Sequence, residues 1–313
     1  MKLYRNCAIG VLFSAVAMAA PPATGSERIV ASIKPIHSLV AAIMGDTGKP
    51  FLIVSGGTSP HSYSLRPSVA KRIGAAKLIF WIGDGLESSL AKPIRALGKK
   101  ARIVTLSRSP GLRTLGFRKG GLFDRPGPDD HDSHAAHETD NHFWLDPANA
   151  KIFTGQIRDA LITAGPDNAA RYSANARALV KKIDALAADI HNRLQPVKGR
   201  PFIVFHDAYH YFEKRFGLPA AGAIAVSPDR KPGVRRLSVM RRKIDRSGAI
   251  CVFAEPQFTP KLVRIVTRGT NARTATLDPI GADLPAGPDL YVTLMRNMAT
   301  AFANCLGAAA SPP

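Results

Sequence analysis

The chain has 313 residues, a hydrophobic fraction of 45% and a formal net charge of +20, from 43 lysines and arginines against 23 acids. This length suffices for two domains of ordinary size. A positive surplus is typical of proteins that bind nucleic acid or an anionic surface, but no nucleic-acid-binding motif accompanies it, so we expect no nucleic-acid partner.

The N-terminus has the pattern of an export signal. Two cations precede a short apolar run, which small residues and two prolines follow: Lys2, Arg5, Cys7–Met18, Ala17–Ala19, Pro21 and Pro22. The run is too short to span a bilayer, and the prolines break it, which argues against the alternative of a membrane anchor. We therefore predict a cleavable signal peptide over residues 1–25 and a soluble protein in the periplasm.

Strand-like runs alternate with helical segments along the rest of the chain, the rhythm of parallel sheets covered by helices. The expected strands are residues 28–33, 51–54, 77–81 and 102–105 in the first half, and 201–205, 222–226, 250–254 and 274–277 in the second. This pattern predicts an α/β fold with two similar lobes, each a four-stranded, mainly parallel sheet with flanking helices.

One long helix is expected between the two halves. Leu179, Ile183, Leu186 and Ile190 recur at helical spacing between Pro166 and Pro196. At 1.5 Å per residue, a helix of roughly 28 residues reaches ~42 Å, the width of a lobe. We expect an N-terminal lobe over residues 26–166, a linking helix over 167–195 and a C-terminal lobe over 196–313.

Two cysteines remain once Cys7 is removed with the signal. Cys251 and Cys305 form an even pair in an oxidising compartment, where disulfides persist. We predict that they are bonded; two buried free thiols are the alternative.

Four side chains from distant parts of the chain are candidates for one metal site. They are His61, His142, His206 and Asp278, which lie in loops or directly after expected strands. The carboxyl ends of parallel strands are where open α/β sheets bind ligands. Imidazole and carboxylate are ligands that Zn²⁺ accepts, and four of them complete a tetrahedral shell. The pattern predicts a metal in the cleft between the lobes.

A second, weaker metal-binding feature is the loop at residues 129–141. It contains His131, His134 and His137 among acids, with no basic residue. Its composition fits either a low-affinity zinc trap or a hydrophilic insert without a binding role.

Other polar residues near the candidate ligands receive different interpretations. We expect His37 to pack or hydrogen-bond near the cleft, and His191 to be exposed on the long helix. His210 is not taken as a ligand; Asp207 and Tyr63 are candidates to orient the imidazoles. Glu87 and Glu255 receive no role. The basic segment 229–246 fits a solvated helix face, with docking to an anionic membrane or a transporter as the alternative.

Eight motifs in order along the chain resemble one family. They are SIKPIHSLVAAI, GGTSPHSYSLRPS, FWIGDGLE, HFWLDP, YSANA, FHDAYHYFEKRFGL, FAEPQF and LDPIG. The chain resembles the zinc-specific periplasmic solute-binding proteins of ABC transporters, the ZnuA-type members of the metal-binding cluster A-I. The resemblance implies a metal at the lobe interface held by His61, His142 and His206. Manganese-type relatives have a carboxylate in place of His206, and because imidazole suits zinc better than manganese, zinc is favoured.

The resemblance implies a monomer that captures Zn²⁺ and passes it to a membrane permease, whose cytosolic ATPase drives import. It implies no enzymatic activity. Some zinc-binding relatives have Glu before the first histidine, where this chain has Pro60, so Asp278 becomes the candidate fourth ligand, with water as the alternative. Other functions compatible with the residues are an exported zinc hydrolase, a carrier of manganese or another divalent metal, and an adhesin.

Overall fold

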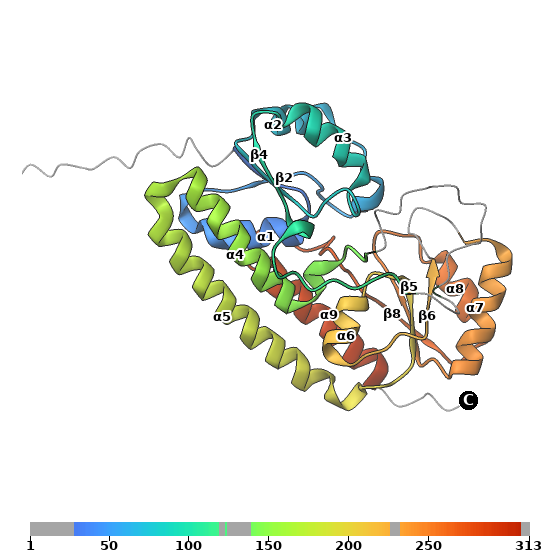
Figure 1. Ribbon diagram of the computed structural model, residues 1–313. Helices are drawn as coiled ribbons and strands as arrows, with labels where there is room; N and C mark the ends of the chain where they lie inside the picture. Colours follow the sequence, from blue (N-terminus) through green and yellow to red (C-terminus); the bar gives the residue numbers. More distant parts are fainter. Residues whose placement is uncertain (1–27, 119–122, 124–138, 226–231, 308–313) are drawn as a thin grey trace, which may run out of the picture.

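The computed structural model describes residues 28–118, 123, 139–225 and 232–307, and consists of two α/β lobes beside a layer of long helices (Figure 1). The predicted signal peptide and the histidines at positions 131, 134 and 137 lie outside these residues. None of the described helices is long and apolar enough to cross a membrane.

The N-terminal lobe contains a four-stranded parallel sheet in the order β2-β1-β3-β4. Its strands are β1 Ile29–Ala31, β2 Phe51–Leu52, β3 Leu78–Trp81 and β4 Arg102–Thr105. The central strands β1 and β3 are buried along their whole length, as their continuous apolar runs predict for a sheet covered on both faces. Three helices belong to this lobe: α1 Lys34–Met44, α2 Pro67–Ala75 and α3 Ser88–Leu97.

The C-terminal lobe repeats this topology, with four parallel strands in the order β6-β5-β7-β8. The strands are β5 Phe202–His206, β6 Gly222–Ala225, β7 Cys251–Ala254 and β8 Arg273–Thr276; the helices are α6 His210–Phe216, α7 Val234–Ser247 and α8 Lys261–Thr267. In both lobes the first and third strands are neighbours, so the chain reverses its direction of winding between them. The predicted α/β fold with two parallel sheets is confirmed.

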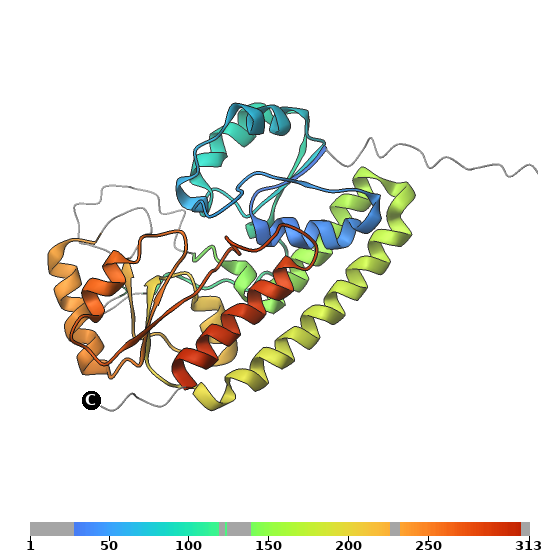
Figure 2. The same ribbon diagram turned by 180° about the vertical axis from the view of Figure 1, so that it is seen from behind.

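The long helix is α5, Ala169–Leu194, which runs along one edge of the molecule past both lobes (Figures 1 and 2). Its buried residues recur at helical spacing, among them Leu179, Ile183, Leu186 and Ile190. This stripe packs against α1, α4 (Pro147–Ala164) and α9 (Leu290–Gly307). The main apolar core therefore runs continuously through both lobes, and the linking helix is part of it.

A buried lysine adds a polar contact between the lobes. Lys34, at the start of α1, donates hydrogen bonds from Nζ to the carbonyl oxygens of Gly281, Ala282 and Leu284, at 2.8, 2.6 and 2.9 Å. Burial lowers the pKa of Lys34, although the nearby carboxylates of Asp278 and Asp283 oppose this effect. The ammonium group fixes the loop after β8 against the N-terminal lobe.

The predicted disulfide is present. Cys251 in β7 is bonded to Cys305 in α9, with Cα atoms 6.2 Å apart. The bond ties the C-terminal sheet to the helical layer that supports both lobes.

Replacing both cysteines by serine should lower the free energy of unfolding by about 2–4 kcal/mol, because the unfolded chain regains the freedom that a closed loop of this length removes. Urea unfolding of the oxidised protein and of the double variant measures the difference. An unchanged midpoint and slope for the variant would contradict the expected contribution.

Candidate metal centre

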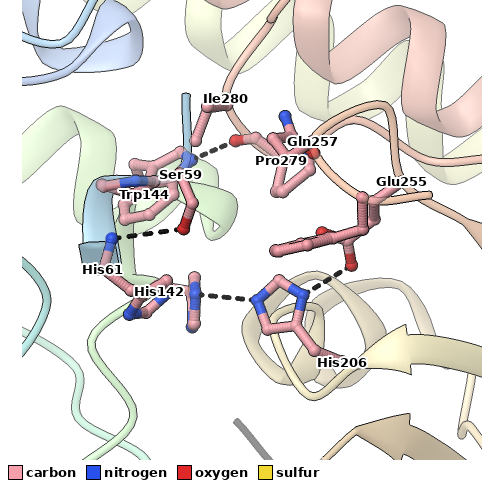
Figure 3. Close-up of a pocket in the computed structure, with 11 residues that line it drawn as sticks. Ser59, His61, His142, Trp144, His206, Glu255, Gln257, Pro279 and Ile280 are labelled. Carbon is pink, nitrogen blue, oxygen red and sulfur yellow. Dashed lines mark hydrogen bonds and ion pairs between the residues drawn. The ribbon is translucent and has the colours of Figure 1, made fainter. Parts of the chain in front are cut away.

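Three of the four predicted ligands converge between the lobes. Ligand nitrogens of His61, His142 and His206 lie within 4.8 Å of one another, and the ring centroids are 5.3 to 5.9 Å apart. They line a cavity of about 10 Å³, the space of roughly one water molecule. Figure 3 shows the imidazoles turned toward this shared space.

His61 lies in a short turn of 3₁₀-helix, Pro60–Ser62, after β2. The Ser59 hydroxyl caps this turn by accepting a hydrogen bond from the His61 amide at 3.3 Å, and Pro60 restricts the backbone at its first position. Burial holds the pKa of His61 well below its ordinary value, and charge on His142 and His206 lowers it further. The ring is therefore neutral at pH 7, as a metal ligand must be.

His142 precedes the 3₁₀-turn Phe143–Leu145, which leads into α4. Asp146 and Pro147 form the predicted start of this helix: the Asp146 carboxylate accepts from the Ala148 amide at 2.9 Å. The His142 ring donates from Nδ1 to Oδ1 of Asp140 at 2.7 Å, and the same oxygen accepts from the His142 amide at 3.0 Å. With its proton on Nδ1, the ring presents the Nε2 lone pair to the cavity.

His206 is the last residue of β5 and is 4% exposed. Its Nδ1 donates to Oε1 of Glu255 at 2.6 Å. Burial by itself lowers the pKa of His206, but the carboxylates of Glu255, Asp207 and Asp140, with Glu255 contributing most, together outweigh burial and the net pKa is raised. Glu255 follows β7, the neighbour of β5, so both groups lie where the sheet reverses its winding, the usual ligand position of such sheets.

The remaining nitrogens have the spacing of a metal shell. Nε2 of His142 lies 3.4 Å from Nε2 of His206, and two nitrogens bound tetrahedrally to one Zn²⁺ at 2.0–2.1 Å are about 3.3 Å apart. Both Nδ1 atoms donate to carboxylates, so two lone pairs face each other in a buried space. A cation between them satisfies both.

Asp278 is not part of this cluster. Its Oδ1 accepts from the amides of Ile280 and Gly281 at 3.2 and 2.9 Å, and its Oδ2 accepts from the amide of Ala282. Gln257 donates a further bond to Oδ1 at 2.9 Å. Gly281 has a φ of +73°, which few residues other than glycine adopt. The carboxylate thus stabilises the turn after β8, the capping role that its position in an Asp-Pro turn also allows.

This turn nevertheless contributes to the site. Trp144, two residues after His142, donates from Nε1 to the carbonyl oxygen of Pro279 at 2.7 Å. Pro279 and Ile280 line the cavity beside the histidines. Asp278 therefore shapes one wall of the cavity through the backbone that its carboxylate holds.

The other polar residues fall into clear positions. His37 bonds through Nε2 to the carbonyl of Pro50 at 3.0 Å, and His191 is exposed on α5, where it contacts Gln195. Asp207 orients no imidazole: its carboxylate pairs with Arg118, which also binds the buried Glu213 at 2.6 Å. The expected orienting role of Asp207 is wrong, because its carboxylate is bonded to the guanidinium of Arg118.

Two functional residues were missed from the sequence, Asp140 and Glu255. Both are buried carboxylates that orient an imidazole. A carboxylate bonded to the ring nitrogen that does not bind the metal makes a metal-ligating histidine more basic. A signal existed for Glu255, which directly follows a buried strand just as His206 ends one. Asp140 was counted only as part of the acidic loop.

Glu87 is fully buried in the N-terminal lobe. It accepts from the Gly83 amide at 3.0 Å, and burial raises its pKa to about 7. It lies in the turn after β3 and, within the described residues, forms no hydrogen bond or ion pair with the three histidines, so we assign it to the support of that turn.

Known proteins resemble this chain over most of its length. The family model described as "Zinc-uptake complex component A periplasmic" matches residues 29–305. The high-affinity zinc uptake system protein ZnuA of Brucella abortus is 47% identical over 309 residues, an alignment that covers 90% of this chain and 92% of the relative. The ZnuA of Yersinia pestis is 35% identical, with 95% and 96% covered.

Solved structures share the fold. A zinc-bound deletion mutant of ZnuA superposes with a TM-score of 0.75 at 25% identity, covering 90% of this chain and 98% of that chain. The periplasmic zinc-binding protein TroA of Treponema pallidum superposes with a TM-score of 0.76 at 20% identity, covering 89% and 98%. With a family model that spans nearly the whole described chain and relatives at this level of identity, the chain belongs to the family of periplasmic A components of zinc-uptake complexes.

Proposed function

We propose that this protein captures Zn²⁺ in the periplasm through His61, His142 and His206 and delivers it to the permease of an ABC transporter. The observation that carries the proposal is the 3.4 Å spacing of the two Nε2 atoms whose partner nitrogens are fixed by carboxylates. Family membership supplies the transport context. The same proposal includes a cleavable signal peptide at residues 1–25 and transport as a monomer. It also includes low-affinity binding of zinc by His131, His134 and His137.

Zinc fits the donor set better than manganese does. Three imidazoles are borderline-soft nitrogen ligands, whereas manganese prefers carboxylate and carbonyl oxygens. Asp278, the carboxylate predicted as a ligand, is already bonded to three backbone amides. We therefore assign three protein ligands and leave the fourth position to water.

The residues around the cavity favour binding and delivery of the ion over catalysis. A zinc hydrolase needs a base beside a metal-bound water, but in the described part of the chain the carboxylate beside the cavity, Glu255, is bonded to the ring of His206. The cavity of about 10 Å³ also has no room for an organic substrate.

The ligand set is tested by titrating zinc against a chelator of known affinity. His61→Ala, His142→Ala and His206→Ala should each weaken zinc binding by more than 100-fold, because each removes one of three protein ligands. His191→Ala is the matched control, since this ring is exposed on α5 far from the cavity, and its affinity should equal that of the wild type. Tight zinc binding by the His142 or His206 variant would refute the assignment.

The metal-free protein should keep its fold, because its core does not depend on the ion. Circular dichroism before and after chelation checks this for the wild type and each variant. Unfolding on chelation would instead indicate a structural zinc site and contradict a role in transport.

Protons should compete with zinc at His206. The raised pKa of His206 means that the metal-free ring gains its proton above the ordinary value of 6.5, so zinc affinity should fall as pH drops through that raised pKa. Glu255→Gln removes the carboxylate charge that contributes most to raising the pKa of His206. The variant should bind zinc about 10–100-fold more weakly at pH 7.5, and its loss of affinity should begin at a lower pH.

Isothermal zinc titrations between pH 5 and 8 follow both effects. Glu213→Gln is the control. It also removes a buried carboxylate, but one that is bonded to Arg118 and not to a histidine, so the pH profile of zinc binding should stay unchanged. If Glu255→Gln and the wild type showed the same profile, Glu255 would not set the protonation of His206.

Asp278→Asn separates the capping role from ligation. The substitution removes charge-assisted bonds to backbone amides, so the free energy of unfolding of the metal-free protein should fall by about 1–3 kcal/mol. Zinc affinity should change less than tenfold. A loss of affinity above 100-fold with unchanged stability would make Asp278 the fourth ligand.

A further inference from the structure

The outer helices of the C-terminal lobe carry an unusual charge. On and just after α7 and α8, eight basic side chains are exposed, against the single exposed acid Asp245: Arg235, Arg241, Arg242, Lys243, Arg246, Lys261, Arg264 and Arg268. We call this the C-lobe basic face. The two helices pack against each other, so their cations form one continuous surface.

The N-terminal lobe has a counterpart on α2, α3 and the adjoining turns, the N-lobe basic face. Its exposed cations are Lys71, Lys77, Lys92, Arg95, Lys99, Lys100 and Arg102. The acids between positions 66 and 102 are Asp84 and the buried Glu87. In Figure 1, α2 and α3 lie at the top and α7 and α8 at the right, both away from α5.

The cations of these faces lack acidic partners. Within the described residues, none of the fifteen side chains on the two faces forms an ion pair, although several on the helical layer do: Lys151 with Asp184 at 2.6 Å, Arg171 with Asp46 at 2.8 Å and Lys182 with Asp289 at 3.8 Å. The two faces therefore carry a large and unpaired part of the positive surplus. Like charges placed together oppose folding slightly, so a purely structural face gains nothing from this pattern.

Apolar side chains emerge on the same faces. The large hydrophobic residues recorded as exposed in the described chain are Leu97, Ile103, Val234 and Ile265. Val234, at the start of α7, is 82% exposed, and Ile265 lies on α8 among the cations. Exposed aliphatic groups among unpaired cations are typical of surfaces that contact a membrane interface.

We propose that the two basic faces bind the surface of an anionic phospholipid bilayer. The faces are convex helix surfaces, and α2, α3, α7 and α8 contain no aromatic residue. A protein partner of comparable strength would call for aromatic anchors and a charge-depleted centre. A fluid anionic surface requires neither, since each nearby lysine or arginine contributes independently to binding.

This binding would hold the protein near the membrane that contains its permease. The helical layer with α5 faces away from both basic faces (Figures 1 and 2). The contact is electrostatic and reversible, so it weakens with salt. It does not depend on zinc, and its failure would leave the metal site as assigned.

Co-sedimentation with vesicles tests the proposal. Vesicles of phosphatidylglycerol and phosphatidylcholine in a ratio of about 1:3, and of phosphatidylcholine alone, are compared at about 0.15 M salt. The wild-type protein should partition at least tenfold more strongly to the anionic vesicles. The triple variant Arg241→Glu, Arg242→Glu and Lys243→Glu should lose at least tenfold of that binding.

A second triple variant distinguishes the effect of the C-lobe basic face from the effect of net charge. Arg177→Glu, Lys181→Glu and Lys182→Glu change the charge equally but lie exposed on α5; this variant should bind anionic vesicles within about twofold of the wild type. Both triple variants should keep the zinc affinity of the wild type, which shows that they are folded.

Two results of the vesicle assay would overturn the proposal. One is wild-type binding that does not distinguish the anionic from the neutral vesicles; the other is an equal loss in the α5 variant, which would make the effect one of net charge. If vesicle binding is absent but zinc uptake by cells falls only in the α7 variant, the C-lobe basic face serves a protein partner and the lipid assignment is wrong.

Discussion

The apolar packing of α5 against α1, α4 and α9 fixes how far apart the two sheets lie, and the metal centre depends on that distance. His61 and His142 come from the N-terminal part of the chain and His206 from the C-terminal sheet. A metal shell tolerates errors of only a few tenths of an ångström in its ligand positions. A linking helix that shares its core with both lobes provides this rigidity, and Lys34 adds a second connection at the loop after β8.

Rigidity alone would not make the imidazoles good ligands. Burial lowers the pKa of His61, and the charge of His142 and His206 lowers it further. Asp140 and Glu255 act in the opposite direction: they accept hydrogen bonds from the Nδ1–H groups, leave the Nε2 lone pairs free and raise the pKa of His206. Burial and carboxylate charge thus act in opposite directions at this centre, and in the function that we propose this balance lets it bind a dication and exchange it for protons.

Charge is distributed over the molecule in three zones with different consequences. Asp140 and Glu255 inside the cleft are bonded to imidazoles. Several exposed charges of the helical layer form ion pairs, among them Lys151 with Asp184 and Arg171 with Asp46. Within the described residues, the fifteen exposed cations of the two basic faces form no ion pair. In the functions that we propose, the inner charges set metal affinity, whereas the outer ones act on a partner at longer range.

The sequence by itself determined the features that depend on local pattern. Strand runs and the helical spacing of Leu179, Ile183, Leu186 and Ile190 predict the two sheets and α5, since burial of a strand or helix face imposes that spacing wherever the element lies. The positions of His61, His142 and His206 were also readable, because each stands at an element boundary where such sheets bind ligands. Cys251 and Cys305 were the sole pair left for a disulfide.

Only the tertiary structure decided which carboxylate serves the metal centre. Glu255 and Asp278 both follow strands, and sequence alone favoured Asp278. The strand order β6-β5-β7-β8 makes β7 the neighbour of β5, so Glu255 reaches His206, whereas Asp278 lies beyond β8, two strand spacings or about 10 Å across the sheet. Strand order depends on non-local contacts, and no local pattern of residues encodes it.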